Sequence, residues 1–105
     1  MNKFMLVLFN LKPGRTDEDF QRWMRENDFP VVSKLDSIDE YNLCRTVTML
    51  GADGRPPYTH MEIIRVNDFA QLEKDAQLPA VQEVGGAMVA DWAEDPVFLL
   101  VEQVL

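Results

Sequence analysis

The sequence predicts an α+β fold in which helices cover one face of a four-stranded antiparallel sheet. Residues 3–11 and 97–105 carry apolar side chains on both strand faces, which is typical of buried strands. Residues 37–50 and 58–66 alternate with a period of two, as half-buried strands do. Apolar residues at helical spacing follow residues 3–11 and again follow residues 58–66. Together these patterns predict strands and helices in a fixed order.

The first predicted strand, residues 3–11, ends at the helix-breaking and turn-forming residues 12–14. Thr16, with Asp19 three residues later, forms a short-armed capping box and predicts the start of a helix. Pro30 disfavours helical geometry in the residue before it but suits the first turn of a continuation, so a bend or restart is expected there. The apolar stripe of this helix consists of Phe20, Trp23 and Met24.

The second half of the chain repeats the pattern of strand and helix. Residues 51–57 are rich in glycine and proline and predict a loop between the second and third strands. Asp68, with Gln71 three residues later, predicts a helix start, and Pro79 suits the first turn of a further helical segment. Gly85-Gly86 lies within that segment, where each glycine costs about 1 kcal/mol relative to alanine. The pair indicates close packing or a kink, and the alternative is a ligand that approaches the backbone.

The order strand, helix, strand, strand, helix in two pieces, strand is the split β-α-β arrangement of a ferredoxin-like α+β domain spanning residues 1–105. Helices in this fold cover only one face of the sheet, yet the first and last strands are apolar on both. A monomer would leave an apolar surface larger than soluble monomers normally expose. We therefore expect a homodimer in which two sheets meet face to face and form a closed β-barrel with the helices outside.

The charge pattern excludes several classes of partner. The chain has 18 acidic and 10 basic residues, a net charge of −8, and the basic residues are scattered, so nucleic acid and anionic membranes are poor partners. The apolar run of residues 4–9 is far shorter than a membrane span. Cys44 is the only cysteine, so no intrachain disulfide is possible and a cytoplasmic location is expected. Cys44 itself is interpreted as a small strand hydrophobe. A small organic ligand or another protein is the expected partner.

His60 is the only histidine and the one group expected to transfer protons near neutral pH. Strand geometry places Tyr58, His60, Glu62 and Ile64 on one face of the third strand. His60 can then serve as a general base oriented by Glu62, or it can be a half-buried histidine satisfied by hydrogen bonds. Both interpretations stay open from the residues alone.

Five further residues are candidates for a pocket, each with a structural alternative. Asp28 either contributes a polar group or caps the helical segment after it. Tyr41 and Tyr58 either donate to a ligand carbonyl or pack in the core or an interface. Trp23 either forms an apolar wall or belongs to the core, and Asn10 either points into the cleft or ends the first strand.

Five motifs along the chain carry a family resemblance. They are Asn27-Asp28-Phe29-Pro30-Val31-Val32-Ser33-Lys34-Leu35, Tyr41, Pro57-Tyr58-Thr59-His60-Met61-Glu62-Ile63, Asp68-Phe69-Ala70-Gln71-Leu72 and Asp91. With them the chain resembles the dimeric α+β barrel superfamily, and more narrowly the EthD-related and RedY-like proteins, which include a member from prodigiosin-type pigment biosynthesis. The resemblance covers essentially the whole chain. EthD-like relatives commonly have a histidine two residues before the first-helix proline, where this chain has Asp28.

The resemblance implies a cleft between sheet and helices that binds a small aromatic or pyrrolic molecule of secondary metabolism. The leading hypothesis is a cofactor-independent enzyme or accessory factor for condensation, cyclisation or oxidation, such as a cyclase or monooxygenase. His60 is then the acid/base and Glu62 its orienter, Asp28 and Tyr41 are polar contacts, and Trp23 is an apolar wall. The alternatives are a non-catalytic carrier of a hydrophobic intermediate and a plain dimeric interaction domain.

Neither haem nor a metal ion is expected as a cofactor. Haem-degrading barrel relatives place the iron-binding histidine on a helix, whereas His60 lies on a predicted strand. One histidine and carboxylates scattered among different elements also do not form a recognisable ligand set. The residues therefore predict no cofactor.

Overall fold

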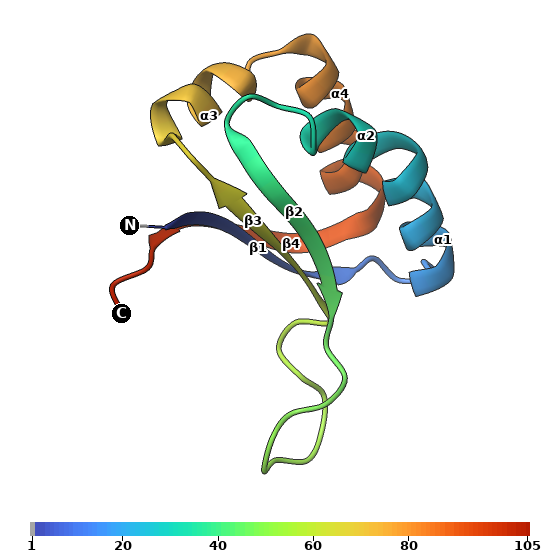
Figure 1. The fold of residues 1–105 in the computed structure, drawn as a ribbon. Helices are drawn as coiled ribbons and strands as arrows, with labels where there is room; N and C mark the ends of the chain where they lie inside the picture. The colour runs from blue at the N-terminus through green and yellow to red at the C-terminus, as the bar shows by residue number, and fades with distance from the viewer. Residues whose placement is uncertain (1) are drawn as a thin grey trace.

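The computed structural model describes residues 2–105, which form one antiparallel sheet in the order β2-β3-β1-β4 with all helices on one face (Figure 1). The predicted order of strands and helices and the split β-α-β topology are confirmed. The strands are β1 (Lys3–Leu11), β2 (Ile38–Arg45), β3 (His60–Val66) and β4 (Ala93–Glu102). The helices are α1 (Asp17–Trp23), η1 (Met24–Asp28), α2 (Phe29–Val32), α3 (Phe69–Asp75), α4 (Pro79–Ala87) and η2 (Met88–Trp92).

The helix starts follow the predicted caps. The Thr16 side chain accepts a hydrogen bond from the backbone N–H of Asp19 and begins α1, and Asp68 likewise begins α3. The bend or restart predicted at Pro30 corresponds to a π-helical turn, η1, which ends before Pro30, and α2 then continues the helix. Such turns insert a residue into the helix and redirect the side chains that follow. None of the helices among residues 2–105 has the length and apolar character needed to cross a bilayer.

Several strand ends differ from the sequence-based prediction. β2 ends at Arg45 and β3 begins at His60, so residues 46–59 form a long loop that projects beyond the sheet (Figure 1). β4 begins at Ala93 and ends at Glu102 instead of spanning residues 97–105. Asp95 has a φ of 48° within β4, where the register against β1 shifts. Pro96 has no N–H to donate to a neighbouring strand, which is tolerated at a bulge or at the edge of a sheet. The irregularity at Asp95-Pro96 lies in β4, an edge strand.

The two faces of the sheet differ in burial. Val7, Phe9 and Ile64 face the helices and are fully buried with Phe20. On the other face Leu6 pairs with Ile63 in β3 and with Leu99 in β4. No helix of residues 2–105 covers this face of the sheet (Figure 1). Leu99 remains 41% exposed. The one-sided helix layer expected from the sequence therefore leaves an uncovered apolar face.

We predict that this face forms a homodimer interface and that Ile63→Glu disrupts it. The new carboxylate would have to enter an apolar contact without a partner, at a cost of several kcal/mol. Sedimentation velocity is expected to show a dimer for the wild type and for Gln77→Glu, which adds the same charge on the exposed helical side. It is expected to show a monomer for Ile63→Glu. A wild-type monomer at tens of micromolar would contradict the prediction.

Candidate functional site

A cleft of about 500 Å³ lies between the helices and the sheet. Its walls are mostly apolar, and two of its lining residues, Phe98 and Leu100 of the edge strand β4, remain about half exposed. Three buried polar side chains line it among these apolar walls. They are Asp28, Tyr41 and Glu62. The cleft therefore combines space for an apolar ligand with a small set of polar groups, as ligand sites in proteins commonly do.

Three elements bring these polar side chains together. Asp28 is the last residue of the π-helical turn η1 and is 3% exposed. Tyr41 lies on β2 opposite Ile64 of β3, and Glu62 lies two residues before Ile64 on the same face. Tyr41 and Glu62 are thus diagonal neighbours across the strand pair. The helix end supplies the third group above them.

The Tyr41 hydroxyl bridges the two carboxyl groups. Its Oη lies 2.7 Å from Oδ1 of Asp28 and also contacts Oε1 of Glu62. A phenol has a single proton and donates only one hydrogen bond. The second contact therefore requires a proton on one of the carboxyl groups, which then donates to Oη.

Burial decides which carboxyl group holds that proton. Burial raises the pKa of Glu62 to about 8, although the hydrogen bond that an ionised Glu62 would accept from Tyr41 lowers it, and the nearby charge of Asp28 raises it further. Burial also raises the pKa of Asp28, although the hydrogen bond from Tyr41 lowers it. Burial and the two carboxylates raise the pKa of Tyr41, which stays a phenol. At neutral pH Glu62 is the protonated donor to Tyr41, and Tyr41 donates to the Asp28 carboxylate.

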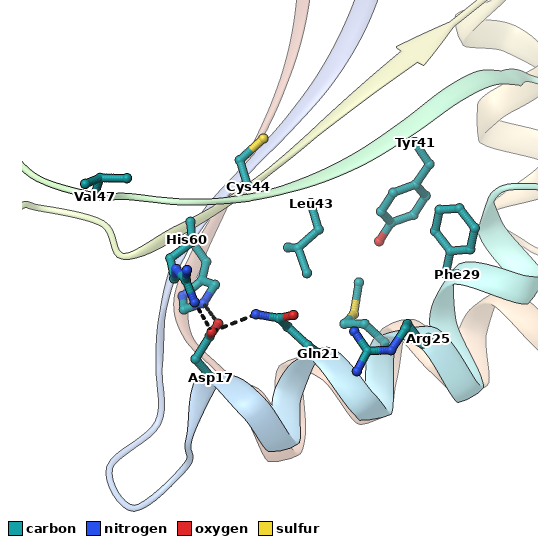
Figure 2. A pocket seen from close by; sticks show the side chains of 11 residues that line it. Asp17, Gln21, Arg25, Phe29, Tyr41, Leu43, Cys44, Val47 and His60 are labelled. Carbon is teal, nitrogen blue, oxygen red and sulfur yellow. Dashed lines mark hydrogen bonds and ion pairs between the residues drawn. The ribbon is translucent and has the colours of Figure 1, made fainter.

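His60 lies beside a second hollow, about 470 Å³, between α1 and the edge strand β2 (Figure 2). Its Nε2 is 2.6 Å from Oδ1 of Asp17, and its Nδ1 is 2.9 Å from the Thr59 hydroxyl. Phe9 stacks on the imidazole ring and Phe20 meets it edge-on, both with ring centres 5.6 Å away. The structure therefore pairs His60 with Asp17 instead of Glu62 and gives both ring nitrogens a partner within the protein.

Asp17 collects several donors at the start of α1. Gln21 donates to it at 2.7 Å and Arg45 at 2.5 Å, in addition to the contact with His60 (Figure 2). Burial opposes ionisation, but these hydrogen bonds outweigh it and lower the pKa of Asp17. The network fastens the first turn of α1 to the ends of β2 and β3. It thereby fixes the helix that continues into η1 and carries Asp28.

The remaining predicted site residues lie away from the cleft. Trp23 packs against Trp92 with ring centres 5.9 Å apart and does not line the cleft. The Asn10 side chain donates to the carbonyl of Pro57 at 3.0 Å and holds the long loop against β1. Tyr58 lies in that loop, just before β3. The structure thus brings together Asp28, Tyr41 and Glu62, but not these three residues.

Sequence reasoning missed Asp17. Its position in the acidic first turn of α1 is typical of a helix start, and that interpretation hides its contact with a histidine 43 residues away. No group of three His, Cys, Asp or Glu side chains within residues 2–105 is arranged to hold a metal ion.

The family model described as REDY-like protein HapK matches residues 3–104 of the chain. Among solved structures, the chain is similar to an EthD family protein from Bacillus halodurans, with 13% identity, a TM-score of 0.78, and coverage of 99% of this chain and 100% of that one. It is similar to HapK from Hahella chejuensis, with 20% identity, a TM-score of 0.75, and coverage of 97% and 92%.

A ferredoxin-like protein from Thermobifida fusca, described as dimeric, also matches, with 9% identity, a TM-score of 0.73, and coverage of 98% and 92%. At these identities the structural matches show a shared fold. No functionally curated protein matches the chain.

We predict that Glu62 makes the fold less stable as the pH rises. The pKa of Glu62 is about 8 in the folded protein and about 4.5 when unfolded. The stability that the protonated Glu62 contributes to the fold is therefore fully present below pH 4.5 and is lost as the pH rises through 8. Glu62→Gln keeps a neutral donor and does not titrate. Urea unfolding at pH 5 and pH 9 gives the free energy of unfolding of the variant and of the wild type. The variant's value minus the wild-type value is expected to be several kcal/mol larger at pH 9 than at pH 5.

The exposed Glu83→Gln substitution is the control for that measurement, because it removes the same charge on the surface of α4. Its difference from the wild type should stay nearly constant between the two pH values. An equally constant difference for Glu62→Gln would show that Glu62 ionises normally in the fold.

Proposed function

Because the chain belongs to the REDY-like protein HapK family, we propose that it is a cofactor-independent acid–base enzyme of secondary metabolism, acting on a small aromatic or pyrrolic intermediate of pigment type. The helix–sheet cleft would bind the intermediate. Asp28, Tyr41 and Glu62 would move its protons. The observation that carries the proposal is the Tyr41 hydroxyl held between two buried carboxyl groups on the wall of an open cleft.

Stability does not account for such a cluster. Burying carboxyl groups costs free energy, and well-packed apolar residues of similar volume are often equally or more stable in their place. Buried carboxyl groups with raised pKa values in a cleft are typical of catalytic sites. A pKa near 8 also keeps Glu62 able to donate a proton at neutral pH.

The proposed step is enolisation of a ligand carbonyl. The Asp28 carboxylate takes a proton from the carbon next to the carbonyl, and the electrons of that C–H bond form a carbon–carbon double bond. The carbonyl π electrons move to oxygen, which takes the proton of Glu62. The products are an enol, a protonated Asp28 and an ionised Glu62.

Tyr41 restores the starting state. Its oxygen accepts the proton from Asp28 while its own proton passes to Glu62, and both partners already contact the same hydroxyl. The cycle consumes no oxidant or reductant. Enolisation is a step common to condensation and cyclisation, so these reactions fit the cluster better than oxidation.

We further propose that the enzyme is a homodimer, which the uncovered sheet face supports. We also propose a cytoplasmic location, as expected from the lone cysteine. The Thermobifida fusca protein that shares the fold is described as dimeric. In this arrangement the helix–sheet clefts lie on the outer side of each sheet. Ligand entry at β4 would then not require the dimer to open.

We expect the protein to accelerate hydrogen–deuterium exchange at the carbon next to the carbonyl of 2-tetralone, an uncharged bicyclic ketone. Proton NMR in D₂O follows the exchange. Glu62→Gln and Tyr41→Phe should slow it by roughly 100-fold or more, the usual contribution of a general acid or base. Glu83→Gln should leave it unchanged. The rate should fall as the pH rises through about 8, where Glu62 loses its proton.

Other outcomes would redirect the assignment. Binding of 2-tetralone without accelerated exchange would favour the non-catalytic carrier. Exchange that survives Glu62→Gln but disappears in a folded His60→Gln variant would return the acid–base role to His60.

A further inference from the structure

We infer that Gly85 determines which ligands the cleft accepts, by leaving room for a flat, uncharged ring against the backbone of α4. The inference rests on the proposed function, since it concerns the same cleft. It adds the chemical class and the position of the ligand.

Neither packing nor backbone geometry requires glycine at position 85. Apart from its two chain neighbours and the backbone of its own helix, a Cβ built on Gly85 meets no heavy atom within 4 Å, and the same holds for Gly86. Neither residue has a positive φ, unlike Gly14, Gly51 and Gly54. The close packing that the sequence indicated for the pair is therefore wrong.

The two glycines differ in what they face. Gly85 lines the cleft, whereas Gly86 does not. Each glycine in the helix costs about 1 kcal/mol relative to alanine. Gly85 is exposed at the wall of the cleft, and its missing side chain leaves open space there, so a ligand can use the room that a side chain would fill.

The lining of the cleft indicates the charge of this ligand. Among residues 2–105 no lysine, arginine or histidine lines it, and its acidic groups are the carboxyl groups of Asp28, Glu62 and the exposed Glu73. A ligand carboxylate or phosphate would find no cation there and would face Asp28. The apolar walls instead suit an uncharged ring system that carries one oxygen or nitrogen for hydrogen bonding with Tyr41 or Glu62.

The test compares Gly85→Leu with Gly86→Leu, which place the same side chain at neighbouring positions of one helix. The probe is prodan, an uncharged fluorescent naphthyl ketone, titrated by fluorescence. We expect Gly86→Leu to keep the wild-type Kd and Gly85→Leu to raise it at least about tenfold, as expected when a bulky group occupies the ligand's space. Unfolding by urea should show both variants at least as stable as the wild type, because leucine favours helices over glycine.

Gly85→Ala and Gly86→Ala form a second pair in case the leucine substitution prevents folding. Alanine adds one methyl group, so we expect a smaller loss of prodan binding that is again confined to position 85. Equal Kd values within each pair, or no prodan binding by the wild type, would overturn the inference. Equally tight binding of anilinonaphthalene sulfonate, an anionic naphthalene dye, in competition with prodan would overturn the assignment of an uncharged ligand.

The result is separable from the catalytic proposal. If the Gly85 variants lose prodan while no variant shows exchange, the ligand position stands and catalysis falls. If exchange of 2-tetralone depends on Glu62 but prodan binding ignores position 85, catalysis stands and this inference falls.

Discussion

The hydrogen bonds of the Tyr41 hydroxyl with two buried carboxyl groups are the constraint on which the site depends. One phenolic proton cannot serve both carboxyl groups, so a second proton must be kept inside an apolar layer. Burial supplies the reason, because it raises the pKa of Glu62 to about 8. The cluster can therefore present a proton donor and a proton acceptor to one ligand at neutral pH.

Placement of Asp28 over the sheet depends on a separate set of contacts. His60 and Arg45 hold Asp17 at the first turn of α1, and the π-helical turn at the end of that helix directs Asp28 inward. The His60 ring is packed against Phe9 and Phe20 with both nitrogens occupied. His60 therefore holds the start of α1 through Asp17, and we propose Glu62, not His60, as the proton donor.

Much of the fold could be predicted because local patterns determine it. The apolar run of β1 ends at a turn, and the caps at Thr16 and Asp68 mark helix starts. The alternating pattern predicted that the second strand continues to residue 50, but β2 ends at Arg45. Val47 fits the strand pattern, yet it is 94% exposed in a loop. The shared face of His60 and Glu62 followed from strand periodicity, but their partners did not. Asp17 reaches His60, and Asp28 reaches Tyr41, the partner of Glu62, from one continuous helical segment. The angle of that segment on the sheet is a tertiary property.

A titration of the Glu62 side-chain carboxyl carbon by ¹³C NMR measures the protonation state of this residue. Assignment requires the wild type and Glu62→Gln, since the Glu62 signal is absent from the variant. We expect a midpoint near pH 8. A midpoint near 4.5, the ordinary value for a glutamate, would contradict it, because Glu62 would then be ionised at neutral pH and unable to donate a proton.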